Sequence, residues 1–410
     1  QDATENALYK QLSKHKAHHG CAVVMEVKTG DIKAIANLEI GSDGLYHETY
    51  NYAVGESTEP GSTFKLMSMI VALEDGVIDL HDTINTGDGT VKYYDKVIRD
   101  HEDEGLGKIT AREVFEHSSN VGTAKIIYEN YKDNPRRYVD RLYSMKINKP
   151  LDLQIKGEGK PVIRAPGDKL WSGISLPMMS HGYEVQMTPL QILTFYNAVA
   201  NGGKMVKPRF VTEVKDGNRV VKSFDTEVIT NAICSRSTIR KAQSLLEGVV
   251  EDGTAKNLKN SNYKIAGKTG TAQIANARHG YRSGARISYQ ASFVGYFPAD
   301  DPLYSCIVVV NAPSNWVYYG NVVSGPVFKE IADKVYASSF YRDLHALNPE
   351  GDEKVTLREA SSEVGKNDLT VAGGIMPNVV GMGLRDAIYM LENSGLRVHY
   401  TGRGRVVKQS

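Results

Sequence analysis

The amino-acid sequence predicts an α+β fold in which helices flank an antiparallel sheet. Three observations predict this fold. Residues 20–27 and 32–38 are rich in β-branched and apolar side chains and are separated by a short turn, which is typical of a β-hairpin. Helical patterns occupy the middle of the chain. Three further strand patterns follow, at 263–266, 289–297 and 304–311.

The predicted helices are of two kinds. In the stretch at 62–73, apolar residues from Phe64 to Leu73 cover nearly every side, and a helix that is apolar all round is buried. Asp75-Gly76 is expected to end this helix. The other helices are expected at 4–17, 110–130, 134–145, 188–201, 236–250 and about 324–337.

Composition excludes several function classes. Of the 410 residues, 41% are hydrophobic and 24% are charged, so the chain can form a packed globular core. A formal net charge of +1 gives no support for nucleic-acid binding. The cysteines, Cys21, Cys234 and Cys306, form neither a C-x-x-C pair nor a disulfide framework. A histidine cluster near the start lacks a third metal ligand, so we expect no metal and no cofactor.

The chain is expected to contain two domains. Residues 1–340 carry the strands and helices described above, and residues 341–374 are polar and rich in charge, as is typical of a linker. Residues 375–410 then form a small module that would be marginally stable alone. This module ends at Ser410 without a recognisable stop signal, which leaves open that it is incomplete. No apolar run reaches the ~18–20 residues that a transmembrane helix needs.

Ser62 and Lys65 form a Ser-x-x-Lys pattern at the start of the apolar helix, directly after a Pro-Gly pair. Positions i and i+3 share a helix face, so the hydroxyl and the amine can meet. A serine needs a base to become a nucleophile, and a lysine half-buried by an apolar helix has a lowered pKa. The pattern also occurs at 13–16 and 261–264, so a single Ser-x-x-Lys is by itself more often a pair of surface residues than a catalytic site.

Ser118 and Asn120 form a Ser-x-Asn pattern just before a helical stretch. One interpretation is structural, because Ser and Asn are favoured helix N-caps. In the functional interpretation, Ser118 relays a proton and Asn120 holds a substrate amide. The acidic run at 100–104 precedes this pattern closely, and although such a run is usually a solvated loop, it can border a cleft.

Lys268, Thr269, Gly270 and Thr271 form a Lys-Thr-Gly-Thr pattern, expected just after the strand at 263–266. The glycines around the lysine let the backbone approach a ligand closely. A lysine and two hydroxyls can hold a carboxylate there. The earlier Lys-Thr-Gly, at 28–30, is expected to be only a hairpin turn.

Together and in this order, the three patterns are the signature of β-lactamases and penicillin-binding proteins, with Ser-Ser-Asn as an accepted variant of the middle one. Other segments resemble class B penicillin-binding proteins in particular: the hairpin at 22–32, the approach at 59–62, and the stretches at 182–183, 187–191 and 200–203. Residues 1–337 resemble the transpeptidase domain of that family throughout. The tail from Met376 resembles a PASTA module.

This resemblance implies a penicillin-recognising fold whose site lies between the sheet and a helical lobe. It implies that Ser62 attacks a stem peptide ending in D-Ala-D-Ala, releases D-Ala, and passes the acyl group to an amine of a neighbouring stem peptide. Lys65 would be the base, and Ser118 and Asn120 would relay and position. Lys268, Thr269, Gly270 and Thr271 would bind the terminal carboxylate, and the backbone N–H groups of Ser62 and Thr271 would form the oxyanion hole.

The resemblance also implies partners and a location. The partners are peptidoglycan stem peptides, β-lactams that acylate the serine, and cell-wall synthesis proteins such as a glycosyltransferase. Family members work on the extracytoplasmic face of the bacterial cytoplasmic membrane, held by an N-terminal anchor that this chain does not contain. The linker and the PASTA-like tail favour a role in septal cell division over one in elongation.

Two departures from the family pattern leave the details of substrate recognition open, and two alternative functions are considered. Glu184 stands where the family usually has glycine, and the loop at 275–283 is basic and unfamiliar. A hydrolase, either a D,D-carboxypeptidase or a β-lactamase, could use the same fold, although no Glu-Pro-x-Leu-Asn-like loop lies between Ser118 and Lys268. A non-catalytic sensor of β-lactams or muropeptides is the other alternative, suggested by the PASTA-like tail.

Overall fold

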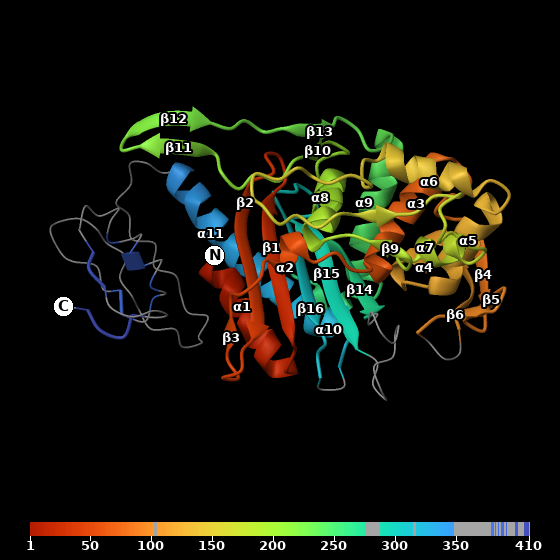
Figure 1. Ribbon diagram of the computed structural model, residues 1–410, viewed down its shortest axis with the longest axis horizontal. Helices are drawn as coiled ribbons and strands as arrows, with labels where there is room; N and C mark the ends of the chain where they lie inside the picture. The colour runs from red at the N-terminus through yellow and green to blue at the C-terminus, as the bar shows by residue number, and fades with distance from the viewer. Residues whose placement is uncertain are drawn as a thin grey trace. The chain divides into compact units, whose positions relative to one another are not determined.

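The computed structural model describes residues 1–101, 105–274, 288–314 and 317–347, with short stretches and single positions between 379 and 409. The chain divides into two compact units, one from Ala3 to Tyr336 and the other from Ala337 onward. Within the described residues, the first unit holds a six-stranded antiparallel sheet, with helices on both faces and a helical lobe beside it (Figure 1). The predicted α+β class is therefore confirmed.

The sheet joins the beginning and the end of the first unit. Its order is β14-β15-β16-β1-β2-β3, and every neighbouring pair is antiparallel. The central strands are apolar on both sides because helices cover both faces. The strand bounds are β1 (His19–Glu26), β2 (Ile32–Ile40), β3 (Tyr46–His47), β14 (Ala266–Gln273), β15 (Tyr289–Phe297) and β16 (Tyr304–Asn311).

The hairpin and the last two strands were predicted correctly, but the strand expected at 263–266 is wrong. β14 begins at Ala266 and contains the whole Lys-Thr-Gly-Thr pattern. The pattern was expected to follow the strand, whereas here it lies within it and its glycines allow close packing in the sheet. A Cβ at Gly267 would lie 2.7 Å from the Phe293 ring, and one at Gly270 would lie 2.2 Å from Ser292 Oγ.

Helices cover both faces of the sheet. Phe293 and Phe297 of β15 contact Phe328 of α11, whereas Ser305 of β16 donates a hydrogen bond to Asn197 of α8. Because side chains alternate between the faces of a strand, α8 and α11 lie on opposite faces (Figure 1). The helices are α1 (Asp2–His15), α8 (Pro189–Ala200), α9 (Arg236–Glu251), α10 (Gly320–Val323) and α11 (Gly325–Leu347).

α11 is longer than the sequence suggested. It was expected to end near residue 337, but it continues to Leu347, into the segment predicted as linker. No proline or glycine interrupts residues 327–347, and Pro349 follows two residues after the helix end. The rest of the predicted linker, from 348 to 374, lies outside the described residues.

The helical lobe surrounds the apolar helix α3, whose side chains from Lys65 to Leu73 are all buried. The single helix expected at 110–130 is wrong, because the chain forms α4 and α5 with a break between them at residues 117–119. The lobe contains η1 (Gly61–Phe64), α3 (Lys65–Glu74), α4 (Ala111–Glu116), α5 (Asn120–Tyr131), α6 (Pro135–Ser144), α7 (Ser175–Ser180) and the strands β4 (Thr83–Gly87), β5 (Thr90–Tyr93), β6 (Lys96–Arg99) and β7 (Gly107–Thr110).

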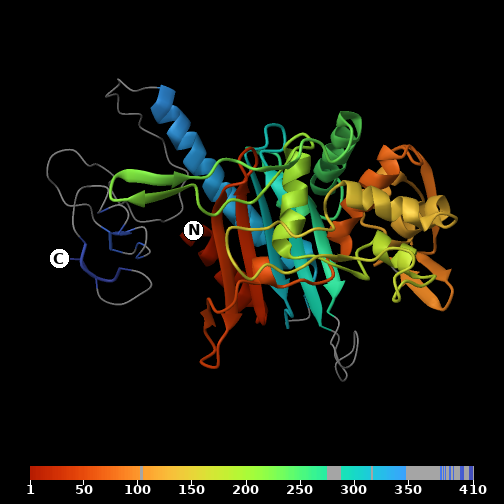
Figure 2. The same ribbon diagram turned by 45° about the horizontal axis from the view of Figure 1, so that its top comes forward.

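Short elements connect these parts. A two-stranded ribbon of β11 and β12, exposed along its whole length, projects from the body (Figure 2). The connecting elements are α2 (Tyr52–Gly55), β8 (Val162–Ile163), β9 (Val185–Gln186), β10 (Met205–Val206), β11 (Glu213–Asp216), β12 (Arg219–Ser223), β13 (Val228–Thr230) and η2 (Lys256–Leu258).

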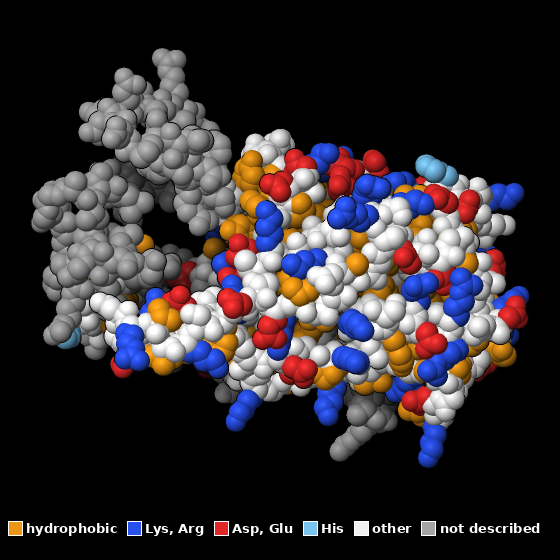
Figure 3. Space-filling view, turned by 90° about the horizontal axis from the view of Figure 1, so that it is seen from above, with side chains coloured by type: hydrophobic (Ala, Val, Ile, Leu, Met, Phe, Trp, Pro, Cys, Tyr) orange, Lys and Arg blue, Asp and Glu red, His pale blue; other side chains and the backbone are white. Residues whose placement is uncertain are grey.

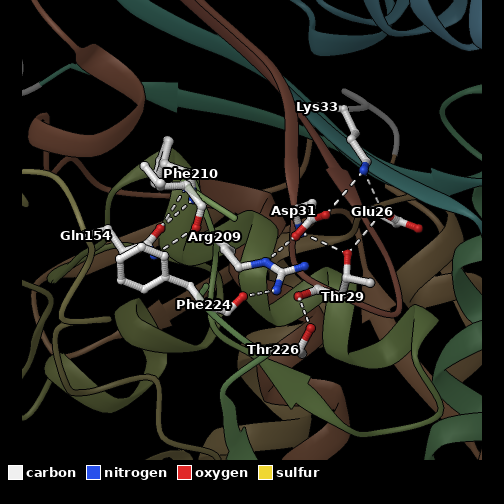
Figure 4. A network of polar contacts seen from close by, with 10 residues as sticks. Glu26, Thr29, Asp31, Lys33, Gln154, Arg209, Phe210, Phe224 and Thr226 are labelled. Carbon is white, nitrogen blue, oxygen red and sulfur yellow. Dashed lines mark hydrogen bonds and ion pairs between the residues drawn. The ribbon is translucent and has the colours of Figure 1, made fainter. Parts of the chain in front are cut away.

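A polar network fixes the base of this ribbon, which as an isolated hairpin would be only marginally stable (Figure 4). Arg209 Nε donates to Asp31 Oδ1 at 2.5 Å, and its Nη1 donates to the carbonyl of Phe224 at 2.5 Å. The carbonyl oxygen of the Gln154 side chain accepts from the backbone N–H of Phe210 at 2.8 Å. The ribbon is thereby attached to the turn between β1 and β2.

The described surface carries charges of both signs. In Figure 3, Lys and Arg side chains are interspersed with Asp and Glu, and hydrophobic side chains form small separate groups. This mixture agrees with the net charge of +1. Among the helices that the structure describes, none combines the length and apolarity required to span a bilayer.

The second unit has a small apolar cluster of its own. Val379, Ala387 and Leu391 are buried, and Met382, Val398 and Val406 pack against them. Ala387 and Leu391 are helical, and the described residues 398–400 form no strand. Beyond Leu347, most residues of this unit lie outside the described part of the chain.

Candidate active site

Ser62 and Lys65 lie at the junction between the 3-10 turn η1 and helix α3. Ser62 is 6% exposed and Lys65 is fully buried, whereas both residues of the copies at 13–16 and 261–264 are exposed. The turn is held on both sides of the serine. Thr63 Oγ1 donates to the Pro60 carbonyl at 2.9 Å, and the Gly61 N–H donates to the Gly182 carbonyl at 3.1 Å.

The three residues of the Ser-Ser-Asn pattern have different structural roles. Ser119 is the N-cap of α5, and its Oγ accepts from the Gly122 N–H at 2.8 Å, so the structural interpretation holds for this serine. Ser118 precedes the cap with a positive φ of 58°, which is rare outside glycine. Asn120 begins the helix, and its Nδ2 donates to the Arg99 carbonyl at 2.8 Å.

The Ser118 hydroxyl lies between the two lysines of the other patterns. Lys65 Nζ donates to Ser118 Oγ at 3.1 Å and to the Ser118 carbonyl at 2.5 Å. Lys268 Nζ donates to the same Oγ at 2.9 Å. Three residues that are far apart in the sequence therefore form one hydrogen-bonded group that joins α3, the start of α5 and β14.

Burial changes the protonation of both amines. Desolvation lowers the pKa of Lys65 to about 7, although the Asp100 carboxylate partly opposes the change. Desolvation, and then the charge of Lys65, lower the pKa of Lys268 well below its ordinary value. Because the two amines share one hydroxyl, protonation of one disfavours protonation of the other. A neutral amine that can accept a proton is therefore available here near neutral pH.

The Lys-Thr-Gly-Thr pattern lies on β14, the edge strand of the sheet that packs against η1. Thr269 Oγ1 lies 2.8 Å from Thr254 Oγ1. A Cβ at Gly270 would also lie 2.9 Å from the Thr63 methyl group, so the strand passes close beside the serine turn. This close approach brings the backbone of β14 next to Ser62.

Two hollows of about 300 Å³ each flank Ser62. Both are lined by Ser62, Asp100, His101 and Thr271. The lining of the first also includes Ser118, Thr254, Thr269, Tyr319 and Asn321. That of the second also includes Asn120, His181, Tyr183, Gln273, Tyr289 and Tyr318, and the rings of the last two stack 4.0 Å apart.

The structure thus places Ser62, Ser118, Thr269 and Thr271 around one hollow, with both lysines bonded to Ser118 and with Asn120 in the adjoining hollow. Sequence reasoning missed Thr254, which no pattern marks. It weighed the acidic run mainly as a solvated loop, but Asp100 lines both hollows. Residues 102–104 and the basic loop at 275–283 lie outside the described residues.

The backbone conformation of Glu184 explains why the family usually has glycine at this position. Its φ is +57°, a left-handed value that glycine adopts without strain. Three contacts hold it there. Its N–H donates to Glu59 Oε1 at 2.9 Å, its carbonyl accepts from Arg164 Nη1 at 3.3 Å, and Ser175 Oγ donates to its carboxylate at 2.6 Å. This departure from the family pattern is therefore a strained residue that local hydrogen bonds support.

Replacing Glu184 with alanine or glycine should give variants of different stability. Both lose the Ser175 contact, but only alanine retains the cost of a left-handed backbone, so the glycine variant should be more stable by about 1 kcal/mol. Chemical denaturation measures the difference. The same two substitutions at Arg240, an exposed residue inside α9, should give the opposite order, because glycine weakens a helix. Equal stabilities at position 184 would contradict the strain.

Comparison with known proteins agrees with this geometry. A family model described as the penicillin-binding protein transpeptidase domain matches residues 20–333, and a PASTA domain model matches residues 374–410. The chain belongs to the class B penicillin-binding proteins. The family resemblance inferred from the three patterns is therefore confirmed.

Three curated relatives show how far the similarity extends. "Probable peptidoglycan D,D-transpeptidase PbpC" of Pseudomonas aeruginosa is 30% identical, over 79% of this chain and 55% of its own length. The stage V sporulation protein D of Bacillus subtilis is 28% identical, over 100% and 61%. The peptidoglycan D,D-transpeptidase FtsI of Escherichia coli is 29% identical, over 85% and 56%. The chain thus spans somewhat over half the length of these relatives.

Among solved structures, the penicillin-binding protein 3 of Mycobacterium tuberculosis complexed with aztreonam is similar, with a TM-score of 0.71. It is 25% identical, and the match covers 83% of this chain and 77% of that one. The fold predicted from the sequence is thus shared with a solved penicillin-binding protein.

Proposed function

We propose that this class B penicillin-binding protein is a peptidoglycan D,D-transpeptidase whose nucleophile is Ser62. One observation carries the proposal: the Ser118 hydroxyl is held between two buried amines, and it lines the same hollow as Ser62. This arrangement would provide a nucleophile, a base and a proton path within one group of buried side chains. Relatives named peptidoglycan D,D-transpeptidases support it.

In the proposed reaction, Ser62 Oγ attacks the carbonyl of the penultimate D-Ala, and its proton passes to the neutral amine of Lys65. The oxyanion accepts hydrogen bonds from the backbone N–H groups of Ser62 and Thr271. Ser118 returns a proton to the nitrogen of the departing D-Ala. An amine of a second stem peptide then attacks the ester, which forms the cross-link and frees the serine.

The remaining residues would bind the donor peptide. Lys268, Thr269 and Thr271 would hold the terminal carboxylate, and Gly270 would let the strand lie close to it. Asn120, in the second hollow, would hold an amide of the stem peptide. β-Lactams would acylate the same serine, which the aztreonam complex of the related structure supports.

A hydrolase is less well supported. A hydrolase needs a group that directs water at the ester. Among the described residues that line the two hollows, the only carboxylate belongs to Asp100. That carboxylate already accepts from Ser119 Oγ at 2.9 Å and from the Val121 N–H at 3.0 Å. A long-lived acyl-enzyme that waits for an amine is therefore the expected behaviour.

We further propose that the protein acts on the extracytoplasmic face of the membrane, together with a glycosyltransferase, at the division septum. Similarity to FtsI supports the septal role. Sporulation is a second candidate, because the similarity to the stage V sporulation protein D extends over the whole chain. A fluorescent fusion of the full-length protein distinguishes them, since a septal enzyme should gather at midcell in growing cells.

Intact mass spectrometry after penicillin treatment tests the enzyme function. Wild-type protein should gain the mass of one penicillin and hold it for hours, whereas Ser62→Ala should gain nothing. Ser13→Ala is the matched control, because it alters an exposed copy of the same pattern, and it should behave as wild type.

Other outcomes identify the alternatives. Labelling that persists in Ser62→Ala would remove this serine from the role. Rapid loss of the adduct would indicate a hydrolase. A stable adduct without cross-linking of a D-Ala-D-Ala stem peptide to an added amine acceptor would indicate a sensor.

A further inference from the structure

Ser118 has a backbone conformation that must be held in place. A serine with a φ of +58° is strained, and such strain persists only where surrounding contacts over-determine it. On its N-terminal side, the Ser118 N–H donates to the Phe115 carbonyl at 3.1 Å. The contacts on its C-terminal side come from a different part of the chain, the end of strand β6.

The end of β6 contacts each of the three residues that follow Ser118. Asp100 Oδ2 accepts from Ser119 Oγ at 2.9 Å, and Asp100 Oδ1 accepts from the Val121 N–H at 3.0 Å. The carbonyl of Arg99 accepts from Asn120 Nδ2 at 2.8 Å. One carboxylate therefore uses both oxygens to hold the first turn of α5.

The hairpin of β5 and β6 gives Asp100 a rigid support. The backbone N–H of Asp100 donates to the Gly89 carbonyl at 2.9 Å, just before β5 begins. Tyr93 and Ile98 of the hairpin form a separate apolar cluster with Val121 and Ala124 of α5. The hairpin and the helix are thus packed together as one piece, with Asp100 at the edge that faces the site.

We infer that Asp100 is a positioning residue, which holds the Ser-Ser-Asn turn so that the Ser118 hydroxyl stays between Lys65 and Lys268. The inference rests on the proposed function. It assigns to the start of the acidic run a role that none of the three patterns contains.

The charge of Asp100 supplies a readout that a purely structural role would not. Among the described residues, the titratable groups that interact with Lys65 come from three elements: Asp100 and His101 at the end of β6, Lys268 on β14, and His181 at the end of α7. Of these groups, only the carboxylate raises the pKa of Lys65. Removing its charge should therefore make the Lys65 amine neutral at a lower pH.

The experiment compares Asp100→Ala with Asp100→Asn in the full chain, using the rate of acylation by a fluorescent penicillin as a function of pH. Asp100→Ala loses both the clamp and the charge, so acylation should slow by about 100-fold. Asp100→Asn keeps atoms that can bond the turn, so most of the rate should return. In both variants the pH at which the rate reaches half its maximum should fall.

Glu74 offers a matched control elsewhere in the fold. Its Oε2 accepts from the Ser235 N–H at 3.1 Å and from Ser235 Oγ at 2.7 Å, so it holds the N-cap of α9 as Asp100 holds that of α5. Glu74→Ala should lose comparable thermal stability while acylation stays within twofold of wild type. The comparison separates loss of positioning from general destabilisation.

Two results would overturn the inference. One is an acylation rate of Asp100→Ala that lies within twofold of the wild-type rate or that is no slower than the rate of Glu74→Ala. The other is an unchanged pH midpoint in both Asp100 variants. Failure of the proposed function would show differently, as the absence of any adduct on wild-type protein.

Discussion

Replacing Lys65 with methionine should slow acylation by penicillin by about 10³-fold, because it removes the base that takes the proton of Ser62. Methionine has a similar length and no charge, so it can fill the buried site of Lys65 without a clash. The rate constant of acylation measures the effect. Lys16→Met and Lys264→Met change the lysines of the two exposed Ser-x-x-Lys copies, and both should acylate as wild type does.

The pH dependence gives the same prediction a second check. Only the neutral amine can accept a proton, and burial lowers the pKa of Lys65 to about 7. The wild-type rate should therefore rise with pH through about 7 and level off above it. The slow rate of Lys65→Met should lack this rise near 7, and a rise that persists would identify another base, with Lys268 the first candidate.

Lys65→Met should be at least as stable as wild type, although it is much less active. The unfolded chain holds a proton on Lys65 up to a pH near 10.5, whereas the folded protein releases it at about 7. Burying this lysine therefore costs stability below the unfolded pKa, and the cost grows as pH falls towards 7. Lys65→Met removes that cost, so its melting temperature at pH 7 should be at least that of wild type.

Patterns local in the sequence predicted most of the fold. The β-branched and apolar runs of β1, β2, β15 and β16 each depend on a few neighbouring residues, and these strands lie where they were expected. The misplaced start of β14 has a different cause, which is packing between distant segments. Gly267 and Gly270 were interpreted as room for a ligand, but the side chains of Phe293 and Ser292 occupy the space that larger residues would need.

In the candidate site too, local patterns predicted the residues but not the contacts between distant segments. The patterns named Ser62, Lys65, Ser118 and Lys268, but they did not show that one hydroxyl joins the two amines, because that contact links residues 150 positions apart. Nor could they show that Asp100 lies at the cleft. The acidic run has the composition of a solvated loop, and only the pairing of β5 with β6 carries its first residue to the start of α5.

Replacing Gly182 with alanine should lower the stability of the protein and slow its acylation, because this glycine packs against the backbone of Gly61, next to the nucleophile. Its φ is +88°, and an added Cβ would lie 2.0 Å from the Gly61 carbonyl oxygen. Its own carbonyl accepts from the Gly61 N–H, next to Ser62. We expect a loss of about 2–5 kcal/mol of unfolding free energy, combining backbone strain with a steric clash.

Acylation by Gly182→Ala should fall by about 100-fold even where the protein remains folded, since the added methyl group displaces the turn that aims Ser62 Oγ. Gly202 provides the control: its φ is +66°, but no atom of the described residues lies within 4 Å of the place that an added Cβ would take. Gly202→Ala should cost only the conformational part, about 1 kcal/mol, and leave acylation unchanged. If the two variants acylated equally fast, backbone strain alone would account for both, and the contact between Gly182 and Gly61 would have no part in placing the nucleophile.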